Sequence, residues 1–237
     1  MAAFTERQKK ILKLIIQEYI KKAKPISSEF LRENNDLSIS TATIRIEMGK
    51  LSAQGYLWQP YTVGGRIPTD KAYRFFVNDL FEKNFFDSID KKFLKKLKEE
   101  KIENLFKFIQ RLTEVLAITS SGLVMTYLFE KDMFWREGLK KVFQEPEFRD
   151  PAFCFTFVKM IECFENEIKN FDKEEFLMPK VFIGQENLLP NTQDFSIIIC
   201  RSYFSKKQPG LISILGPKRM TYKKNIRLIN SVSELLK

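Results

Sequence analysis

The segment from Ser38 to Thr69 constrains the fold of this chain more strongly than any other part of the sequence. A serine that can cap a helix precedes apolar residues at helical spacing, and Gly55 separates this helix from a short strand-forming run. The pair Gly64-Gly65 then permits a tight turn before the chain returns and re-enters a helix. This order of parts is typical of a winged helix-turn-helix, which binds DNA through a helix and a hairpin.

Two further helices are predicted before this segment. Thr5 begins a capping-box pattern, and apolar residues at helical spacing extend the first helix to about Lys22. Ser27 or Ser28 can cap a short second helix, and Ser40 can cap the third. The first two helices therefore provide a surface on which the third can pack.

The third helix has two faces of different composition. Ile44, Met48 and Leu51 recur at helical spacing and predict the face that packs on the first two helices. The opposite face has small residues at its centre and Arg45 and Lys50 at its edges, so its backbone could approach the floor of a DNA groove. An ordinary solvated face is the alternative interpretation, because arginine and lysine usually face solvent.

The residues predicted to contact DNA lie on the third helix and in the loop that follows it. Arg45 is the strongest candidate for a base contact, and Arg66 is the strongest candidate for the DNA backbone or the minor groove. The complete set is Thr41, Thr43, Arg45, Ile46 and Lys50 on the helix, and Tyr61, Thr62, Gly65 and Arg66 in the loop.

Composition narrows the classes of function. The 237 residues contain no histidine, which removes the nucleophile pairs, general bases and metal ligands built on imidazole. The three cysteines lack CxxC spacing and are odd in number, which predicts free thiols and neither a zinc site nor a disulfide framework. We therefore expect no catalytic residue, no metal and no cofactor. The formal net charge of +10 is compatible with a nucleic-acid partner or an anionic membrane surface and does not choose between them.

The rest of the chain predicts an α+β domain with an antiparallel sheet. An amphipathic linking helix is expected over residues 83–103, and helices and strands follow up to a closing helix at about 222–236. One of these helices is expected to begin near Trp135. The predicted domains are residues 1–82 for DNA binding, 83–103 as the linking helix, and 104–237 for regulation or dimerisation. Neither a signal peptide nor a membrane span is predicted.

Motifs at both ends of the chain resemble one family. The stretch TATIRIEMGKLSAQGYLWQPYTVGGRIPTDKAYRFFV is similar to the N-terminal signature of the HrcA family, the heat-inducible transcription repressors of bacteria. The stretches WREGLKKVFQEPEF, VFIGQEN and GLISILGPKRMTYKKNIRLINSVSELL are similar to its C-terminal signatures. The resemblance implies a winged helix that recognises CIRCE, an inverted repeat in double-stranded DNA upstream of chaperone operons. It also implies a GAF-like second domain, a GroE-type chaperonin as partner and a cytoplasmic location.

The sequence departs from the family pattern in two places. The family carries an inserted domain associated with dimerisation, whereas here only Phe129 to Phe134 join Leu128 to Trp135. The chain is therefore interpreted as a short form with a reduced GAF-like domain. The family motif ATIRNEM has asparagine where this chain has Ile46. Asparagine can pair with adenine, whereas isoleucine offers only apolar contact, so a different operator preference is expected.

Three functional hypotheses follow from these residues. A two-fold operator predicts a homodimeric repressor that acts by occupying DNA. Alternatively, the GAF-like domain could bind a small ligand and alter DNA affinity, although no convergent polar pocket can be named from the sequence. The third hypothesis is a reduced interaction protein that has lost operator binding.

Overall fold

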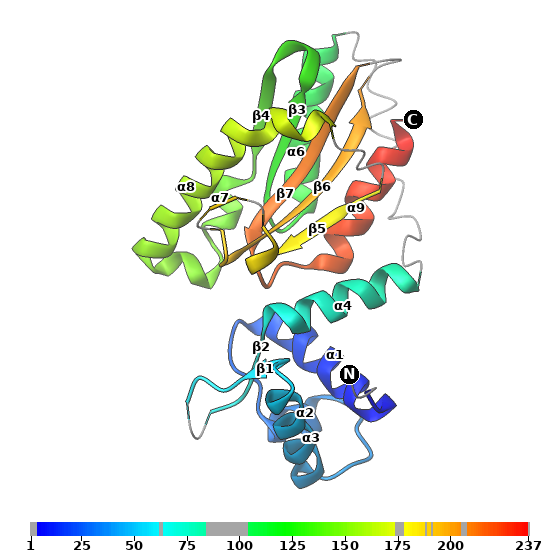
Figure 1. The fold of residues 1–237 in the computed structure, drawn as a ribbon, viewed down its shortest axis with the longest axis vertical. Coiled ribbons are helices and arrows are strands. Elements are labelled where there is room, and N and C mark those ends of the chain that lie inside the picture. The colour runs from blue at the N-terminus through cyan, green and yellow to red at the C-terminus, as the bar shows by residue number, and fades with distance from the viewer. Residues whose placement is uncertain are drawn as a thin grey trace. The chain divides into compact units, whose positions relative to one another are not determined.

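The computed structural model describes residues 4–61, 64–83, 104–173, 178–187, 189–190, 192–204 and 208–236. It divides into two compact units, Met1–Asp79 and Leu80–Lys237 (Figure 1). The linking helix expected over residues 83–103 lies outside the described residues except for Lys83. That helix and the three domain boundaries therefore remain predictions.

The first unit consists of helices and a two-stranded antiparallel sheet. Its elements in chain order are α1 (Glu6–Lys22), α2 (Ser28–Asn34), α3 (Thr41–Ala53), β1 (Leu57–Trp58), β2 (Ile67–Pro68) and α4 (Asp70–Glu82). The side chains of Thr5, Ser27 and Ser40 accept hydrogen bonds from backbone N–H groups at the starts of α1, α2 and α3. The caps predicted at Thr5 and Ser40 are confirmed, and of the two candidates for α2, Ser27 is the cap. The three caps satisfy donors that a helix leaves unpaired at its N-terminus.

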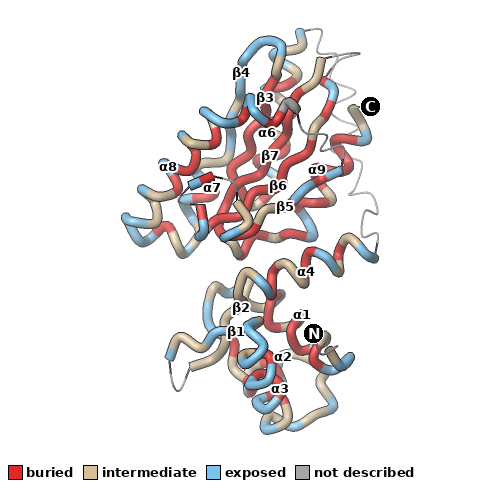
Figure 2. The backbone as a smooth tube through the Cα atoms, viewed as in Figure 1, coloured by how far each residue is buried: buried red, intermediate tan, exposed pale blue. Residues whose placement is uncertain are grey.

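The core of the first unit lies between α1, α2 and α3. Ile11 and Ile15 of α1 are fully buried, as are Leu31 of α2 and Ile44 of α3. Helix α3 packs against both α1 and α2, and the buried parts of the helices are red in Figure 2. On the other side of α1, Lys13 pairs with Asp79 of α4 at 2.7 Å. Helix α3 is therefore held in place by the apolar residues that are buried on one of its sides.

The second unit is built from a mixed set of helices and strands. Its elements are α6 (Leu105–Thr119), β3 (Leu123–Leu128), η1 (Phe129–Lys131), β4 (Met133–Glu137), α7 (Leu139–Val142), η2 (Pro146–Arg149), α8 (Pro151–Glu167), η3 (Ile168–Lys173), β5 (Lys180–Ile183), η4 (Gly184–Glu186), β6 (Phe195–Tyr203), β7 (Pro209–Pro217) and α9 (Tyr222–Leu235). The strands form an antiparallel sheet in the order β4-β3-β7-β6-β5. The predicted α+β class with an antiparallel sheet is confirmed.

Helices cover both faces of this sheet. On one face, Thr113 of α6 donates to Thr126 of β3 at 2.9 Å, and α9 packs on the same face against β6. On the opposite face, Met125 of β3 lies in one apolar cluster with Phe157 and Phe164 of α8. Because successive strand residues point to opposite faces, β3 is buried along its whole length.

The prediction of a helix that begins near Trp135 is wrong. Trp135 lies in β4, where it is paired with Thr126 of β3, and the helix α7 begins only at Leu139. Asp132 takes the left-handed conformation at the end of η1 and reverses the chain, so Met133–Glu137 runs back along β3. The Trp135 ring stacks on Phe106 of α6 at a centroid distance of 6.0 Å.

Two further predictions concern membranes and thiols. The described helices include none with both the length and the apolar character needed to cross a bilayer. Cys154, Cys163 and Cys200 are free thiols, as predicted; Cys200 is buried and the other two are partly exposed.

Candidate nucleic-acid interface

Helix α3 is packed on one face and open on the other. Ile44 and Leu51 are fully buried and Met48 is 3% exposed, which confirms the predicted inner face. On the outer face, Ile46 is 59% exposed, and Arg45, Gly49 and Lys50 are exposed as well. The outer face therefore presents an apolar side chain between two basic ones, with glycine beside them.

Glu47 is a residue of α3 that sequence reasoning missed. Its side chain is 4% exposed, and Gln8 of α1 donates to its Oε2 at 3.0 Å. Arg7 and Lys50 approach Oε1 at 3.2 and 3.4 Å. A buried carboxylate needs such partners, so Glu47 joins the start of α1 to the middle of α3. Lys50, a predicted DNA contact, also takes part in this network.

Arg45 forms an ion pair with α2. Its Nη2 donates to Oε1 of Glu29 in a short contact, and the two side chains are 68% and 52% exposed. The hydroxyl of Ser28 donates to the other carboxylate oxygen of Glu29 at 3.1 Å. The backbone N–H of Glu29, then Ser28 and then Arg45 lower the pKa of the Glu29 carboxyl, which is therefore ionised at neutral pH.

Arg66 lies at the base of the loop between β1 and β2. Its backbone N–H donates to the carbonyl of Ile26 at 2.8 Å, and its own carbonyl accepts from Ile26 at 2.9 Å. The guanidinium Nε donates to Ser52 Oγ of α3 at 3.2 Å, and Nη1 donates to the carbonyl of Gly64 at 3.4 Å. The side chain therefore lies between α3 and the loop, half-buried.

Gly65 has a packing role that the sequence did not reveal. A Cβ atom added there would lie 2.5 Å from the carbonyl carbon and oxygen of Ile26, closer than real Cβ contacts allow. The loop therefore passes directly against the chain before α2, and only glycine fits at this point. Tyr61, near the tip of the same loop, is 73% exposed.

Eight of the nine predicted residues are described, and they divide into three groups in the structure. Arg45, Gly65 and Arg66 lie together around a polar cleft of about 420 Å³. Ile46, Lys50 and Tyr61 are exposed outside its lining, and the half-buried Thr41 and Thr43 lie in the first turn of α3. Thr62 falls outside the described residues. The cleft is lined by Ser27, Ser28, Glu29, Arg45, Met48, Gln59, Gly64, Gly65 and Arg66.

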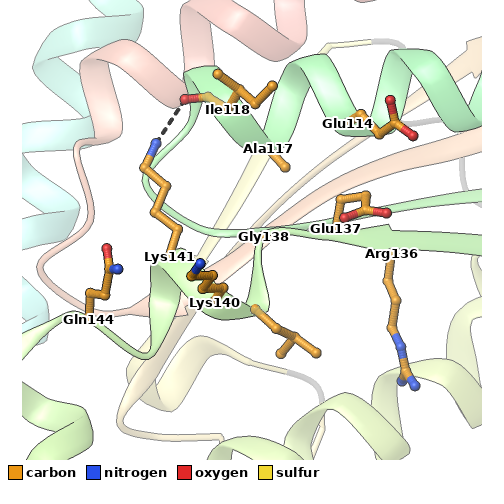
Figure 3. A pocket seen from close by; sticks show the side chains of 10 residues that line it. Glu114, Ala117, Ile118, Arg136, Glu137, Gly138, Lys140, Lys141 and Gln144 are labelled. Atoms are coloured by element: carbon orange, nitrogen blue, oxygen red, sulfur yellow. Dashed lines mark hydrogen bonds between the residues drawn. The ribbon is translucent and has the colours of Figure 1, made fainter.

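A second hollow, of about 600 Å³, lies in the second unit between α6, the end of β4 and α7 (Figure 3). Lys141 at its edge donates from Nζ to the carbonyl of Ile118, at 2.9 Å, and to that of Ser120. Burial, and then repulsion from Lys224, lowers the pKa of the Lys141 ammonium. This lysine therefore caps the C-terminal end of α6. The lining comprises Glu114, Ala117, Ile118, Arg136, Glu137, Gly138, Leu139, Lys140, Lys141 and Gln144.

The lining of the second hollow carries both signs of charge. Arg136 donates to Glu165 of α8 at 2.6 Å, and Glu114, Glu137 and Lys140 also line the hollow. A lining with charges of opposite sign does not define a site for a ligand of either charge. Among the residues that the structure describes, no group of three or more acidic or thiol side chains is arranged to hold a metal ion.

Fold and interface together define a two-unit α+β protein whose helical first unit exposes one face of a helix beside a polar cleft. The family model described as the HrcA protein C terminal domain matches residues 69–226. The chain belongs to the HrcA family.

One named relative aligns with nearly the whole chain, and another aligns with about half of it. The heat-inducible transcription repressor HrcA of Thermoanaerobacter sp. (strain X514) is 26% identical, over 98% of this chain and 95% of the relative. That alignment extends over 328 positions, more than the 237 residues of this chain, so the relative contains residues that have no counterpart here. The HrcA repressor of Carboxydothermus hydrogenoformans is 41% identical over 112 residues, which are 47% of this chain and 33% of the relative.

A solved structure supports the fold. The crystal structure of a protein described as hypothetical matches 99% of this chain and 98% of its own, with a TM-score of 0.83 and 18% sequence identity. At this identity the likeness concerns the fold alone.

Proposed function

We propose that this protein is a DNA-binding transcription repressor whose α3 helix reads an operator in the major groove. The observation that carries the proposal is the two-sided environment of α3, which is held by buried Ile44 and Leu51 and exposes Arg45 and Ile46. A helix held from behind presents its outer side chains in a defined orientation, as base recognition requires. The matched relatives are named heat-inducible transcription repressors, which favours chaperone operons as the target.

The first unit acts as a winged helix-turn-helix in this proposal. Helices α2 and α3 pack on each other as the helix-turn-helix, and the β1–β2 hairpin is the wing. The second unit, with helices on both faces of an antiparallel sheet, serves as the reduced GAF-like domain. We assign no catalysis to either unit, in keeping with the transcription repressors among its relatives.

Each predicted contact has a role in this interface. Arg45 reaches a base edge, and Ile46 contacts an apolar group such as a thymine methyl. Thr41 and Thr43 lie in the first turn of α3, where hydroxyl and N–H groups suit a phosphate. Arg66 and the wing residues Tyr61, Thr62 and Gly65 contact the flanking backbone or minor groove, and Lys50 contributes a phosphate contact.

The partners beyond DNA follow from the operator and the family. A CIRCE-type operator is an inverted repeat, and a two-fold site is matched by a homodimer. A GroE-type chaperonin is proposed to keep the repressor active until heat stress occupies the chaperonin with other clients. Both partners are compatible with a cytoplasmic location. Sedimentation of the free protein, and its DNA affinity with and without chaperonin, test these two partners separately.

Fluorescence anisotropy with a CIRCE-type duplex and a scrambled duplex, at several salt concentrations, tests the DNA-binding proposal. Arg45→Ala is expected to weaken binding to the specific duplex by about 1 to 3 kcal/mol. Arg66→Ala is expected to weaken binding to both duplexes alike and to reduce the slope of log K against log salt by about 0.9. Arg149→Ala, an exposed arginine of the second unit, is the matched control. Equal affinity of the wild-type protein for both duplexes at every salt concentration would refute the proposal.

The ligand-sensing hypothesis receives less support. The hollow of the second unit has walls of mixed charge, and Lys141 already donates to two carbonyl groups. Loss of operator binding, the third hypothesis, is tested by the same anisotropy experiment.

A further inference from the structure

Glu29 is an acidic side chain beside an interface proposed to meet a polyanion. It lies on α2 and not on α3, and its carboxylate lines the same cleft as Arg45 and Arg66. A carboxylate at this place repels phosphate groups, so its presence calls for a physical reason. Fold stability is a weak reason, because an exposed ion pair contributes little to stability.

The Glu29 carboxylate is held at both oxygens. Oε2 accepts from the Ser28 hydroxyl at 3.1 Å, and Oε1 accepts from Nη2 of Arg45. Ser28 is itself buried, and Ser27 caps the helix that carries both residues. The carboxylate is therefore fixed relative to α2, and it fixes one edge of the Arg45 guanidinium relative to α3.

This pairing changes what Arg45 can bind. A free guanidinium is attracted to any phosphate, and a phosphate contact carries no sequence information. The pair of guanidinium and carboxylate carries little net charge, so the attraction of Arg45 to the DNA backbone is reduced. Its remaining N–H groups still point in fixed directions and can donate to the neutral acceptors of a base edge, such as those of guanine.

We propose that Glu29 is a specificity-determining residue, which orients Arg45 for a base edge and opposes its use as a phosphate contact. The inference rests on the proposed DNA-binding function and names a residue outside the predicted contact set. Because specificity is a ratio of two affinities, Glu29 acts by weakening the unwanted complex as well as by shaping the wanted one.

The test compares two duplexes and five proteins: the wild type, Glu29→Gln, Glu33→Gln, Arg45→Gln and the double variant Glu29→Gln/Arg45→Gln. The specific duplex is the one that the wild-type protein selects from a random library, and the second duplex is its scrambled sequence. Glu29→Gln is compared with Glu33→Gln, which removes the same charge from an exposed position one turn further along α2. The double variant Glu29→Gln/Arg45→Gln shows whether the effect passes through Arg45. Thermal unfolding followed by circular dichroism verifies that each variant is folded.

Glu29→Gln is expected to tighten binding to the scrambled duplex, to steepen its salt slope by about 0.9, and to lower the specificity ratio about tenfold. Glu33→Gln is expected to change both affinities alike and leave the ratio as in wild type. In the background of Arg45→Gln, the substitution at Glu29 is expected to leave the ratio unchanged.

Two results overturn the inference. If the wild-type protein discriminates but Glu29→Gln keeps its ratio, or changes it no more than Glu33→Gln does, the role of Glu29 is wrong and the repressor proposal stands. If library selection enriches no sequence, the repressor proposal fails and the inference fails with it.

Discussion

Arg45 in the first unit and Arg219 in the second are both paired with glutamate, but in opposite surroundings. Arg219 is 8% exposed, and its Nη2 donates to Glu147 at 2.7 Å and to Glu145 at 2.5 Å. Burial alone would lower the pKa of Arg219, but the two carboxylates raise it above its ordinary value. Arg45 is 68% exposed, and among the described residues its ion-pair partner is Glu29. The same pairing is therefore structural where water is excluded and available to a partner where the pair faces solvent.

The largest effect is expected at the buried arginine. Arg219→Met leaves two partly buried carboxylates without their cation, and we expect the free energy of unfolding to fall by about 3 kcal/mol. Denaturant unfolding measures this change. Arg149→Met, at an exposed position of the same unit, is expected to change stability by less than about 0.5 kcal/mol. Similar losses for both variants would remove the contrast between buried and exposed arginine.

The next effect concerns the cleft that holds Arg45. Gly65→Ala places a Cβ atom 2.5 Å from the Ile26 backbone, and the loop must move, which is expected to cost about 2 kcal/mol of stability. Gly49→Ala is the opposite control, because a Cβ there meets nothing within 4 Å and alanine favours the helix by about 1 kcal/mol. The thermal unfolding temperatures of the two variants should therefore shift in opposite directions from that of the wild type. A stable Gly65→Ala variant would show that the loop can move freely.

Helix α3 allows the same comparison between one exposed residue and one buried residue. Ile46→Asn, on the exposed face, is expected to shift base preference at one operator position toward adenine by about 1 to 3 kcal/mol. Ile44→Asn, two residues away and fully buried, is expected instead to destabilise the first unit. Selection from a random duplex library measures the first change. An unchanged selected sequence for Ile46→Asn would show that this residue does not face a base.

The smallest expected effect is on the stability of the exposed pair. Arg45→Ala removes one solvent-exposed ion pair, so the free energy of unfolding should change by at most about 1 kcal/mol. Denaturant unfolding of this variant, beside its DNA affinity, separates binding from folding. A loss comparable to that of Arg219→Met would assign Arg45 a structural role.

Local signals in the sequence were sufficient for much of the fold. Thr5 and Ser40 cap their helices as predicted, and Ser27, one of two predicted candidates, caps α2, because a cap depends on residues only two or three positions away. The buried face of α3 was predictable for the same reason, since Ile44 and Leu51 lie on one face at helical spacing. The candidate interface could be located from the sequence to this extent.

Contacts between distant residues were not predictable in this way. Trp135 looked helical in the sequence, but its conformation is set by pairing with β3 after the turn at Asp132. Glu47 reads as an ordinary helix-surface residue, although Gln8 donates to it from 39 positions away. Nothing local indicates that the start of α1 reaches the middle of α3.

The sequence by itself determined the helices of the first unit, the antiparallel α+β character of the second and the resemblance to the HrcA family. Only the tertiary structure decided which charges are held and by what: Glu29 beside Arg45, Glu47 beside Gln8, and Arg219 between two glutamates. The physical reason is range. Caps and periodicity act over one or two helical turns, whereas an ion pair depends on which elements pack together and how far each side chain is removed from water.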